Sequence, residues 1–274
     1  MKLGYVCTNY HNSALTIAAV KSLLRGSAHQ HHIVVVDNAS GMEELTKLRH
    51  LPAEHPQVLV IANAVNVGYF RGLNIGLREL RARYPDHEWI VVGNNDLEFP
   101  PEFTDALEAH LPRLAAHSVI SPDIVTLDGE HQNPHVISAI SGFRELVYDL
   151  YYSNYLVGRL IHGLARLLPR WSERPDEQAW RTARPIYQGH GSCYVLGPRF
   201  FAQFGELWAP TFMMHEEYFL AKQLLDAGEQ VYYEPQLRVT HHWHGSLASI
   251  SGRARWNMAR DAHREYRKYV KAFR

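Results

Sequence analysis

The sequence is poor in cysteine, balanced in charge and without long apolar runs. Its 274 residues contain two cysteines, Cys7 and Cys193, which argues against a disulfide framework and favours a reducing, cytoplasmic setting. Lys and Arg together number 28, as do Asp and Glu, so the overall charge gives no sign of a nucleic-acid partner. No stretch approaches the roughly 20 apolar residues of a membrane span, and the first residues lack a signal-peptide core. We therefore expect a soluble globular protein.

Several motifs are also missing. There is no G-x-G-x-x-G, which disfavours a dehydrogenase. The His-rich segment THHWHGS, residues 240–246, has neither a nearby cysteine pair nor H-E-x-x-H, so a structural zinc site is a weak hypothesis there. On a strand, His242 and His244 share a face and His241 points the other way. A single histidine such as His242, reaching a metal or a phosphate, is the better hypothesis.

Short apolar runs alternate with helical patterns in the first hundred residues. The runs at 3–7, 31–40, 58–63 and 88–96 read as strands, and the segments between them read as helices. This alternation predicts an α/β fold with a parallel sheet and right-handed crossovers. Further along, the pattern predicts a strand over 186–196 and a terminal helix from 252.

Polar residues follow each of the predicted strands. They are Thr8–His11, Asp37–Ser40, Asn63 and Asn94–Asp96. Ligands of such sheets bind at the carboxyl ends of the strands, so we expect these side chains to form a binding edge. Asp37 suits an acceptor for the N3–H of uracil or thymine, although it could equally cap the next helix.

Asp96 stands in the run VVGNNDLEF, directly after an apolar strand. A carboxylate beside nucleotide phosphates needs a cation between them, and Mg²⁺ or Mn²⁺ is commonly held by one or two carboxylates plus phosphate oxygens. Asp96 would be that ligand and Glu98 a helper. The alternative is an ordinary turn, in which Asn and Asp are common.

Two further segments carry candidate residues. NVGYFRGLNIGL, residues 66–77, has three glycines four apart, which indicates close packing of a helix on the sheet, while Asn66, Arg71 and Asn74 are candidates for base, ribose or phosphate contacts. Glu216 and Glu217 begin a helical pattern. They either complement the helix dipole or provide a general base for a sugar hydroxyl.

Taken in order, these segments resemble an inverting family 2 glycosyltransferase of the GT-A fold, in its rhamnosyltransferase-like branch. The matching pieces are TNYHNS, VVVDNAS, NVGYFRGLNIGL, VVGNNDLEF, HEEYFLAKQLLDAG and EPQLRVTHHWHGS, which together span about residues 3 to 246. The resemblance implies a single domain over 1–274, with a Rossmann-like, mostly parallel central sheet flanked by helices. It divides into a nucleotide-sugar half (1–100), an acceptor half (101–250) and a basic C-terminal helix (251–274).

The resemblance also implies roles for individual residues. Asp37 would bind the nucleobase of a UDP- or dTDP-sugar, Asp96 would hold Mn²⁺ or Mg²⁺, and Glu217 would be the base, with Glu216 beside it. Glu in place of the family's Asp leaves open which of the two is the base. The other implied donor contacts are Thr8, Asn9, Tyr10, Asn66, Arg71, Asn74 and Asn95.

The implied acceptor is a hydroxyl of a glycan or lipid-linked saccharide in cell-surface polysaccharide assembly. Residues 143–171 form an aromatic, amphipathic stretch that suggests core packing, an acceptor cleft or a membrane-facing surface. The basic segment 252–274 suggests either peripheral membrane contact or a solvated helix docked by its aromatic side. Alternative functions are a sugar-nucleotide pyrophosphorylase, disfavoured by the lack of a Gly-rich basic loop near the N-terminus, and a non-catalytic nucleotide-sugar-binding module.

Overall fold

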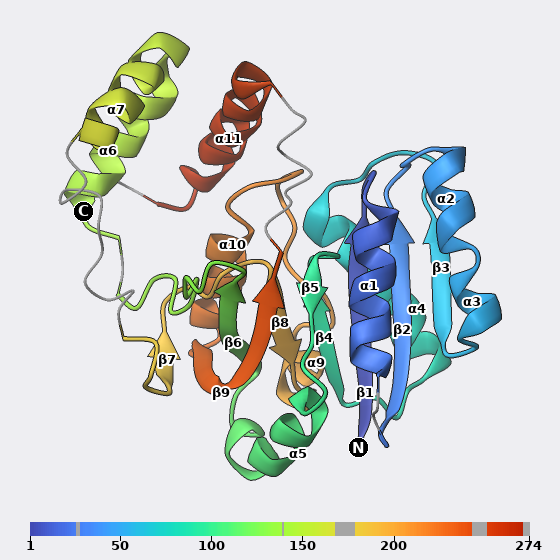
Figure 1. Ribbon diagram of the computed structural model, residues 1–274. Coiled ribbons are helices and arrows are strands. Elements are labelled where there is room, and N and C mark those ends of the chain that lie inside the picture. The colour runs from blue at the N-terminus through green and yellow to red at the C-terminus, as the bar shows by residue number, and fades with distance from the viewer. Residues whose placement is uncertain (26–27, 139, 168–178, 243–250, 271–274) are drawn as a thin grey trace.

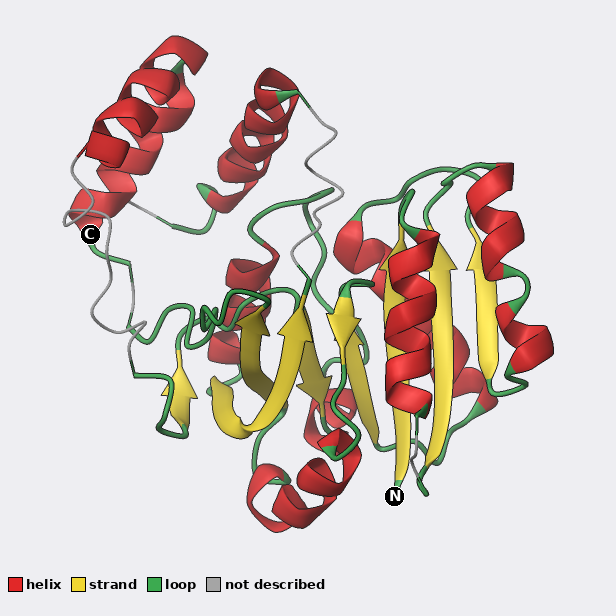
Figure 2. Ribbon diagram, in the orientation of Figure 1, coloured by secondary structure: helices red, strands yellow, loops and turns green. Residues whose placement is uncertain are grey.

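The computed structural model describes residues 1–25, 28–138, 140–167, 179–242 and 251–270. It has the expected α/β architecture, in which helices cover both faces of one twisted sheet (Figures 1 and 2). The strands are β1 (Lys2–Asn9), β2 (Gln30–Asp37), β3 (Val58–Ala62), β4 (Trp89–Gly93), β5 (Leu97–Glu98), β6 (Val119–Thr126), β7 (Arg184–Ile186), β8 (Cys193–Leu196) and β9 (Val231–His241). Their order is β3-β2-β1-β4-β8-β6-β9-β5, with β7 paired to β9.

The helices follow the predicted alternation in the first half of the chain. Here α1 (Ser13–Leu24), α2 (Met42–Leu48), α3 (Leu51–Glu54) and α4 (Tyr69–Arg83) connect the strands. The later helices are α5 (Phe103–Leu114), α6 (Gly142–Ser153), α7 (Tyr155–Leu167), α9 (Pro198–Gln203), α10 (Glu216–Asp226) and α11 (Gly252–Tyr266).

Strands β1 to β4 are parallel neighbours, and their register explains why the predicted polar residues meet. Asn9 at the end of β1 lies opposite Asp37 at the end of β2, which in turn lies opposite Ala62 at the end of β3. The middle residues of these strands are apolar because helices cover both faces of the sheet. The predicted convergence of strand ends is therefore confirmed.

Helix α4 packs very closely on this part of the sheet. A Cβ added to Gly76 would lie 2.3 Å from Cγ1 of Val6, so no larger residue fits there without a shift. The close packing predicted from the glycine spacing is confirmed.

The second half of the sheet is mixed rather than parallel. Strand β8 runs antiparallel to both β4 and β6, whereas β6 and β9 are parallel. The prediction of one strand over 186–196 is wrong, because β7 ends at Ile186 and β8 begins at Cys193. The segment between them approaches α10 closely: a Cβ on Gly191 would lie 2.6 Å from Oε1 of Glu217.

Helices α6, α7 and α11 stand away from the sheet, on the side to which the parallel strands point (Figure 1). Trp256 and Tyr266 of α11 are buried, so this helix is docked by its aromatic side, one of the two alternatives drawn from the sequence. Among the described helices, none is long and apolar enough to cross a membrane. Trp171, His244 and residues 271–274, which the sequence also singled out, lie outside the described residues.

Candidate active site

A pocket of about 250 Å³ opens at the carboxyl ends of β1 and β4, beside the start of α10. Six segments of the chain form its walls, so no single motif could have revealed it. Seven of the residues predicted from the sequence lie here together. The described lining comprises Thr8, Tyr10, Asn38, Asn66, Gly68, Tyr69, Asn94, Asn95, Asp96, His190, Gly191, Ser192, Met213, Met214, Glu216 and Glu217.

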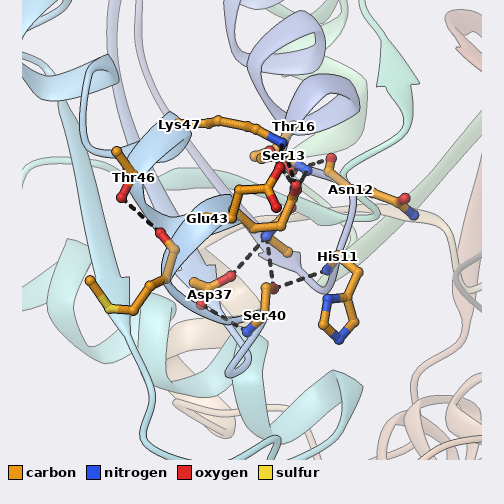
Figure 3. A network of polar contacts seen from close by, with 12 residues as sticks. His11, Asn12, Ser13, Thr16, Asp37, Ser40, Glu43, Thr46 and Lys47 are labelled. Atoms are coloured by element: carbon orange, nitrogen blue, oxygen red, sulfur yellow. Dashed lines mark hydrogen bonds and ion pairs between the residues drawn. The ribbon is translucent and has the colours of Figure 1, made fainter.

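A buried polar network lies at the ends of β1 and β2 (Figure 3). Asp37 accepts hydrogen bonds from Nδ2 of Asn9 at 2.8 Å and from the backbone N–H of Ser40 at 3.1 Å. The Ser40 hydroxyl oxygen accepts from the same Asn9 amide at 3.0 Å and from the backbone N–H of His11 at 3.0 Å. Asp37 and Asn9 therefore shape the edge of the sheet from inside, and neither is a lining residue of the pocket.

This geometry bears on both interpretations of Asp37. The N-cap of α2 is Gly41, so Asp37 is not its capping residue, although it does hold the turn before that helix. The carboxylate already accepts two hydrogen bonds from the protein, and its contact with a nucleobase stays a prediction.

Asn95 connects the network to the pocket. Its Nδ2 donates to Oγ1 of Thr16 at 2.8 Å, and Thr16 in turn donates to Oδ1 of Asn9 at 2.6 Å. The ends of β1 and β4 are thereby tied together, which holds the neighbouring Asp96 in a defined position.

Two predicted donor contacts have structural roles. Arg71 donates from Nε and Nη2 to the carbonyl oxygens of Ala209 and Pro210, each at 3.1 Å. The Asn74 amide donates to the Leu207 carbonyl at 2.8 Å and accepts from the Leu207 N–H at 2.9 Å. Both residues fix the loop that leads to Met213 and α10, and neither lines the pocket. Asn66 does line it, and its Oδ1 accepts from the backbone N–H of Gly68 at 2.9 Å.

The carboxyl group of Asp96 faces a histidine that the sequence analysis did not select. Oδ1 of Asp96 lies 3.2 Å from Nε2 of His241, and both side chains are buried. Nδ1 of His241 lies 2.7 Å from Oε1 of Gln132, and because an amide oxygen only accepts, Nδ1 carries the proton. Nε2 therefore turns either a lone pair or a second proton toward Asp96. Burial works to raise the pKa of Asp96, but the close approach of His241, with smaller effects of the backbone and Asn94, outweighs it and leaves the pKa below its ordinary value.

His242, the residue proposed from the sequence, lies elsewhere. Its Nε2 is 2.9 Å from Oε2 of Glu98, at the rim of the sheet. The alternation of side chains along an extended chain explains the difference, because His241 at the end of β9 faces Asp96 and the next residue points the other way.

Asp96 and His241 fit a divalent cation. Adjacent ligands of an octahedral ion with bonds of about 2.1 Å are roughly 3.0 Å apart, close to the separation seen here. Oδ1 of Asp96 is buried and makes no hydrogen bond to any described residue, and the Gln132 contact fixes the orientation of the histidine, as hydrogen-bond partners of metal-binding histidines do. Within the described ranges, no group of three or more His, Cys, Asp or Glu side chains suits a metal. The pair would therefore need ligands from a bound diphosphate.

Two acids lie at the first turn of α10, after a strained turn. Met214 and His215 both adopt left-handed backbone angles, with φ of 77° and 64°, which is rare for residues with side chains and often marks functional sites. The turn buries Glu216, and burial, with a smaller contribution from the Glu217 carboxylate, raises the pKa of Glu216 to about 8. At neutral pH the protonated form of Glu216 is therefore favoured. A protonated carboxyl group cannot act as a general base.

Glu217 lies between two pockets. Its Oε1 accepts a hydrogen bond from the Gly191 N–H at 3.2 Å, and the Gly191 carbonyl accepts one from the Tyr69 hydroxyl at 2.9 Å. Glu217 lines the strand-end pocket and also a second pocket of about 230 Å³. We call the latter the aromatic pocket; its described lining is His135, Val136, Ile140, Tyr148, Tyr152, Gln188, His215, Glu217, Tyr218 and Tyr266.

Comparisons with known proteins agree with this arrangement. The family model described as glycosyl transferase family 2 matches residues 5–161, more than half of the chain. An N-acetylglucosaminyl-diphospho-decaprenol L-rhamnosyltransferase of Mycobacterium tuberculosis is 26% identical over 202 residues, which are 69% of this chain and 60% of that protein. The low-salt glycan biosynthesis hexosyltransferase Agl10 of Haloferax volcanii is 28% identical over 216 residues, 78% of this chain and 59% of that protein. The chain thus spans about three fifths of the length of these relatives.

Solved structures show the same fold at low identity. GalNAc-T7 with UDP, GalNAc and Mn²⁺ superposes with a TM-score of 0.58 at 14% identity, over 89% of this chain and 44% of that one. The mannosyltransferase PcManGT of Pyrobaculum calidifontis, in complex with GDP-Man and Mn²⁺, gives a TM-score of 0.57 at 14% identity, over 98% and 65%. The expected GT-A fold is confirmed. Fold, strand-end pocket and family model agree, and the chain belongs to glycosyl transferase family 2.

Proposed function

We propose that the chain transfers a sugar from a UDP- or dTDP-sugar to a hydroxyl of a glycan or lipid-linked acceptor, with inversion at the anomeric carbon. The observation that carries the proposal is the position of Glu217, which lines both the strand-end pocket and the aromatic pocket. A base that removes a proton from one substrate while that substrate attacks another must reach both binding sites.

The strand-end pocket is the proposed donor site. Thr8, Tyr10, Asn66 and Asn95 offer hydroxyl and amide groups to the nucleoside and sugar, and Asp37 with Asn9 supports the edge on which they stand. Asp96 lies in the same pocket, where the diphosphate would be.

Asp96 and His241 would hold Mn²⁺ or Mg²⁺ at this site. When bound, such an ion supplies positive charge beside the departing diphosphate. Gln132 positions His241, and the links between Thr16, Asn9 and Asn95 keep the strand end that carries Asp96 in register.

The aromatic pocket is the proposed acceptor site. Tyrosine and histidine side chains give it flat faces with polar edges, which suit a saccharide ring. Glu217 takes the proton of the acceptor hydroxyl as the hydroxyl oxygen bonds to the anomeric carbon. The bond from that carbon to the diphosphate oxygen breaks, and its electron pair leaves with the nucleoside diphosphate. A single displacement inverts the anomeric configuration.

The relatives support the acceptor class and the setting. One is named for an N-acetylglucosaminyl-diphospho-decaprenol acceptor and the other for glycan biosynthesis. We infer a role in cell-surface polysaccharide assembly, at the cytoplasmic face of a membrane with peripheral contact. Two buried cysteines that are both free, Cys7 and Cys193, suit a reducing compartment.

A screen of nucleotide sugars tests the donor assignment. UDP- and dTDP-sugars with Mn²⁺ should raise the melting temperature, because a ligand at 100 times its Kd stabilises the folded chain by about 2.7 kcal/mol. Thermal unfolding in the presence of UDP-, dTDP-, GDP- and ADP-sugars measures this. A response to GDP-sugars alone would overturn the choice of nucleobase, and no response to any of them would count against a donor site.

A further inference from the structure

Helices α6 and α7 form a hairpin whose outer surface is apolar. Of the twelve large hydrophobic side chains that are exposed in the described part of the chain, six lie on these two helices. They recur every three or four residues, so each helix presents one apolar side. The six, here called the hairpin face, are Phe143, Leu146, Leu150, Leu156, Leu160 and Leu164.

In the hairpin, the apolar side chains are exposed, whereas an ordinary surface helix buries them. In α6 the buried residue is the acid Glu145, while phenylalanine and leucine are exposed. An amphipathic helix in water normally buries its apolar side, so contiguous exposure on this scale marks an interaction surface. Core packing, one interpretation of this stretch from its sequence, does not describe these six residues.

The acids of the hairpin are turned away from the hairpin face, toward α11. Glu145 accepts a hydrogen bond from the Tyr266 hydroxyl and lies 3.0 Å from Nη1 of Arg267. Asp149 lies 2.9 Å from Nε2 of His263 and 2.5 Å from Nε of Arg267. Helix α11 thus covers the polar side of α6, while the side chains of the hairpin face are exposed.

The remaining charge on the hairpin is positive. Helix α7, with the sequence YLVGRLIHGLARL, contains no acid, and Arg159 is exposed on it. Arg144 adds a cation in the first turn of α6. An apolar face flanked by arginine and cleared of acids complements the interface of an anionic bilayer, where leucines enter the acyl region and cations meet the phosphates.

The hairpin face is continuous with the proposed acceptor site. A groove of about 690 Å³ runs between the two helices, lined among others by Phe143, Leu150 and Leu164. Tyr148 and Tyr152 line both this groove and the aromatic pocket that contains Glu217. The groove of the hairpin therefore borders the pocket that contains the proposed base.

We propose that the α6–α7 hairpin docks on an anionic lipid bilayer through the hairpin face. Docking in this orientation places the aromatic pocket next to the membrane surface, where the saccharide of a lipid-linked acceptor would be presented. The statement about the acceptor rests on the proposed function, whereas docking on the bilayer does not.

Flotation with vesicles tests the docking without any substrate. The full chain should bind phosphatidylcholine vesicles that contain phosphatidylglycerol, and bind pure phosphatidylcholine vesicles more weakly. Leu156→Ser/Leu160→Ser removes two hairpin-face side chains that are 70% and 64% exposed, and should weaken partitioning at least about tenfold. The matched control, Met42→Ser/Leu127→Ser, changes side chains that are 66% and 62% exposed elsewhere, and should bind like the parent chain.

Three results would overturn the docking proposal. The first is that the parent chain does not bind vesicles, and the second is that the hairpin variant binds them as well as the parent does. The third is a lipid-free dimer of the parent chain in sedimentation velocity that is lost in the hairpin variant, which would assign the hairpin face to a second copy of the chain.

Transfer assays separate the docking from the proposed function. The hairpin variant should match the parent on a water-soluble acceptor and lose activity on an acceptor embedded in vesicles. Vesicle binding without transfer to any acceptor would support docking and count against the proposed activity.

Discussion

Glu217→Gln should lower turnover by at least about two orders of magnitude while the chain folds normally, because a positioned general base contributes about 10²–10⁴-fold. Glutamine keeps the oxygen that accepts the Gly191 hydrogen bond but cannot take a proton from the acceptor hydroxyl. Donor binding should change little, since the side chain remains similar in size. Steady-state turnover, with donor affinity and melting temperature as companions, measures the effect.

Glu216→Gln is the matched control for that variant. Because Glu216 keeps its proton at neutral pH, glutamine imitates its resting form, and turnover should stay within about tenfold of the parent chain. If Glu216→Gln loses activity and Glu217→Gln keeps it, the roles of the two acids are reversed.

Glu216→Gln should also change how the stability of the chain depends on pH. The pKa of Glu216 is about 8 in the folded chain against an ordinary 4.5, so the folded state holds the extra proton and loses stability as pH rises from 4.5 through 8. Glutamine has no proton to lose. Glu216→Gln should therefore gain stability over the parent progressively across that interval, as followed by denaturant unfolding.

Asp96→Asn should abolish the response to added Mn²⁺ or Mg²⁺ and lower turnover by at least about a hundredfold, since metal-bound charge is worth several kcal/mol to a departing anion. Asparagine keeps the size of the side chain and removes the charge that a divalent ion needs. Titration of turnover with metal after chelation measures both effects, and binding of Mn²⁺ by the nucleotide-loaded chain provides a readout independent of activity. Full turnover of the parent chain in excess chelator would contradict the metal assignment.

Two adjacent histidines provide the matched pair for this test. His241→Asn should weaken the metal response, because Nε2 of His241 lies 3.2 Å from the Asp96 carboxylate. His242→Asn should leave it intact, because His242 contacts Glu98 at the rim. If His242→Asn weakens the metal response and His241→Asn leaves it intact, His242 is the histidine at the metal, as the sequence suggested, and His241 is not.

The sequence predicts the site well where chemistry follows from strand ends. Asp96 and Thr8 share a pocket because the carboxyl ends of parallel strands meet at one edge, a rule that needs no coordinates. Glu216 and Glu217 join them because α10 begins at the same edge. Asp37 reaches the edge as well, but its register opposite Asn9 directs its carboxylate into the sheet rim instead of the pocket.

Other features depend on contacts between distant segments. Arg71 and Asn74 stand in a motif that suggests ligand contacts, yet their partners are backbone atoms of residues 207–210, which only the folded chain brings near. The choice between His241 and His242 depends on how β9 pairs with β5. The exposed side of α6 could not be foreseen either, because α11 decides which side is covered, and it covers Glu145 and Asp149.

The position of a bound nucleotide tests the central claim, that Asp96 and Glu217 line one donor site. A crystal structure with UDP or dTDP and Mn²⁺ would measure it. The account predicts the diphosphate and the ion against Asp96 and His241, with Glu217 across the pocket on the side of the aromatic pocket. A nucleotide bound outside this pocket, with its phosphates away from Asp96, would contradict it.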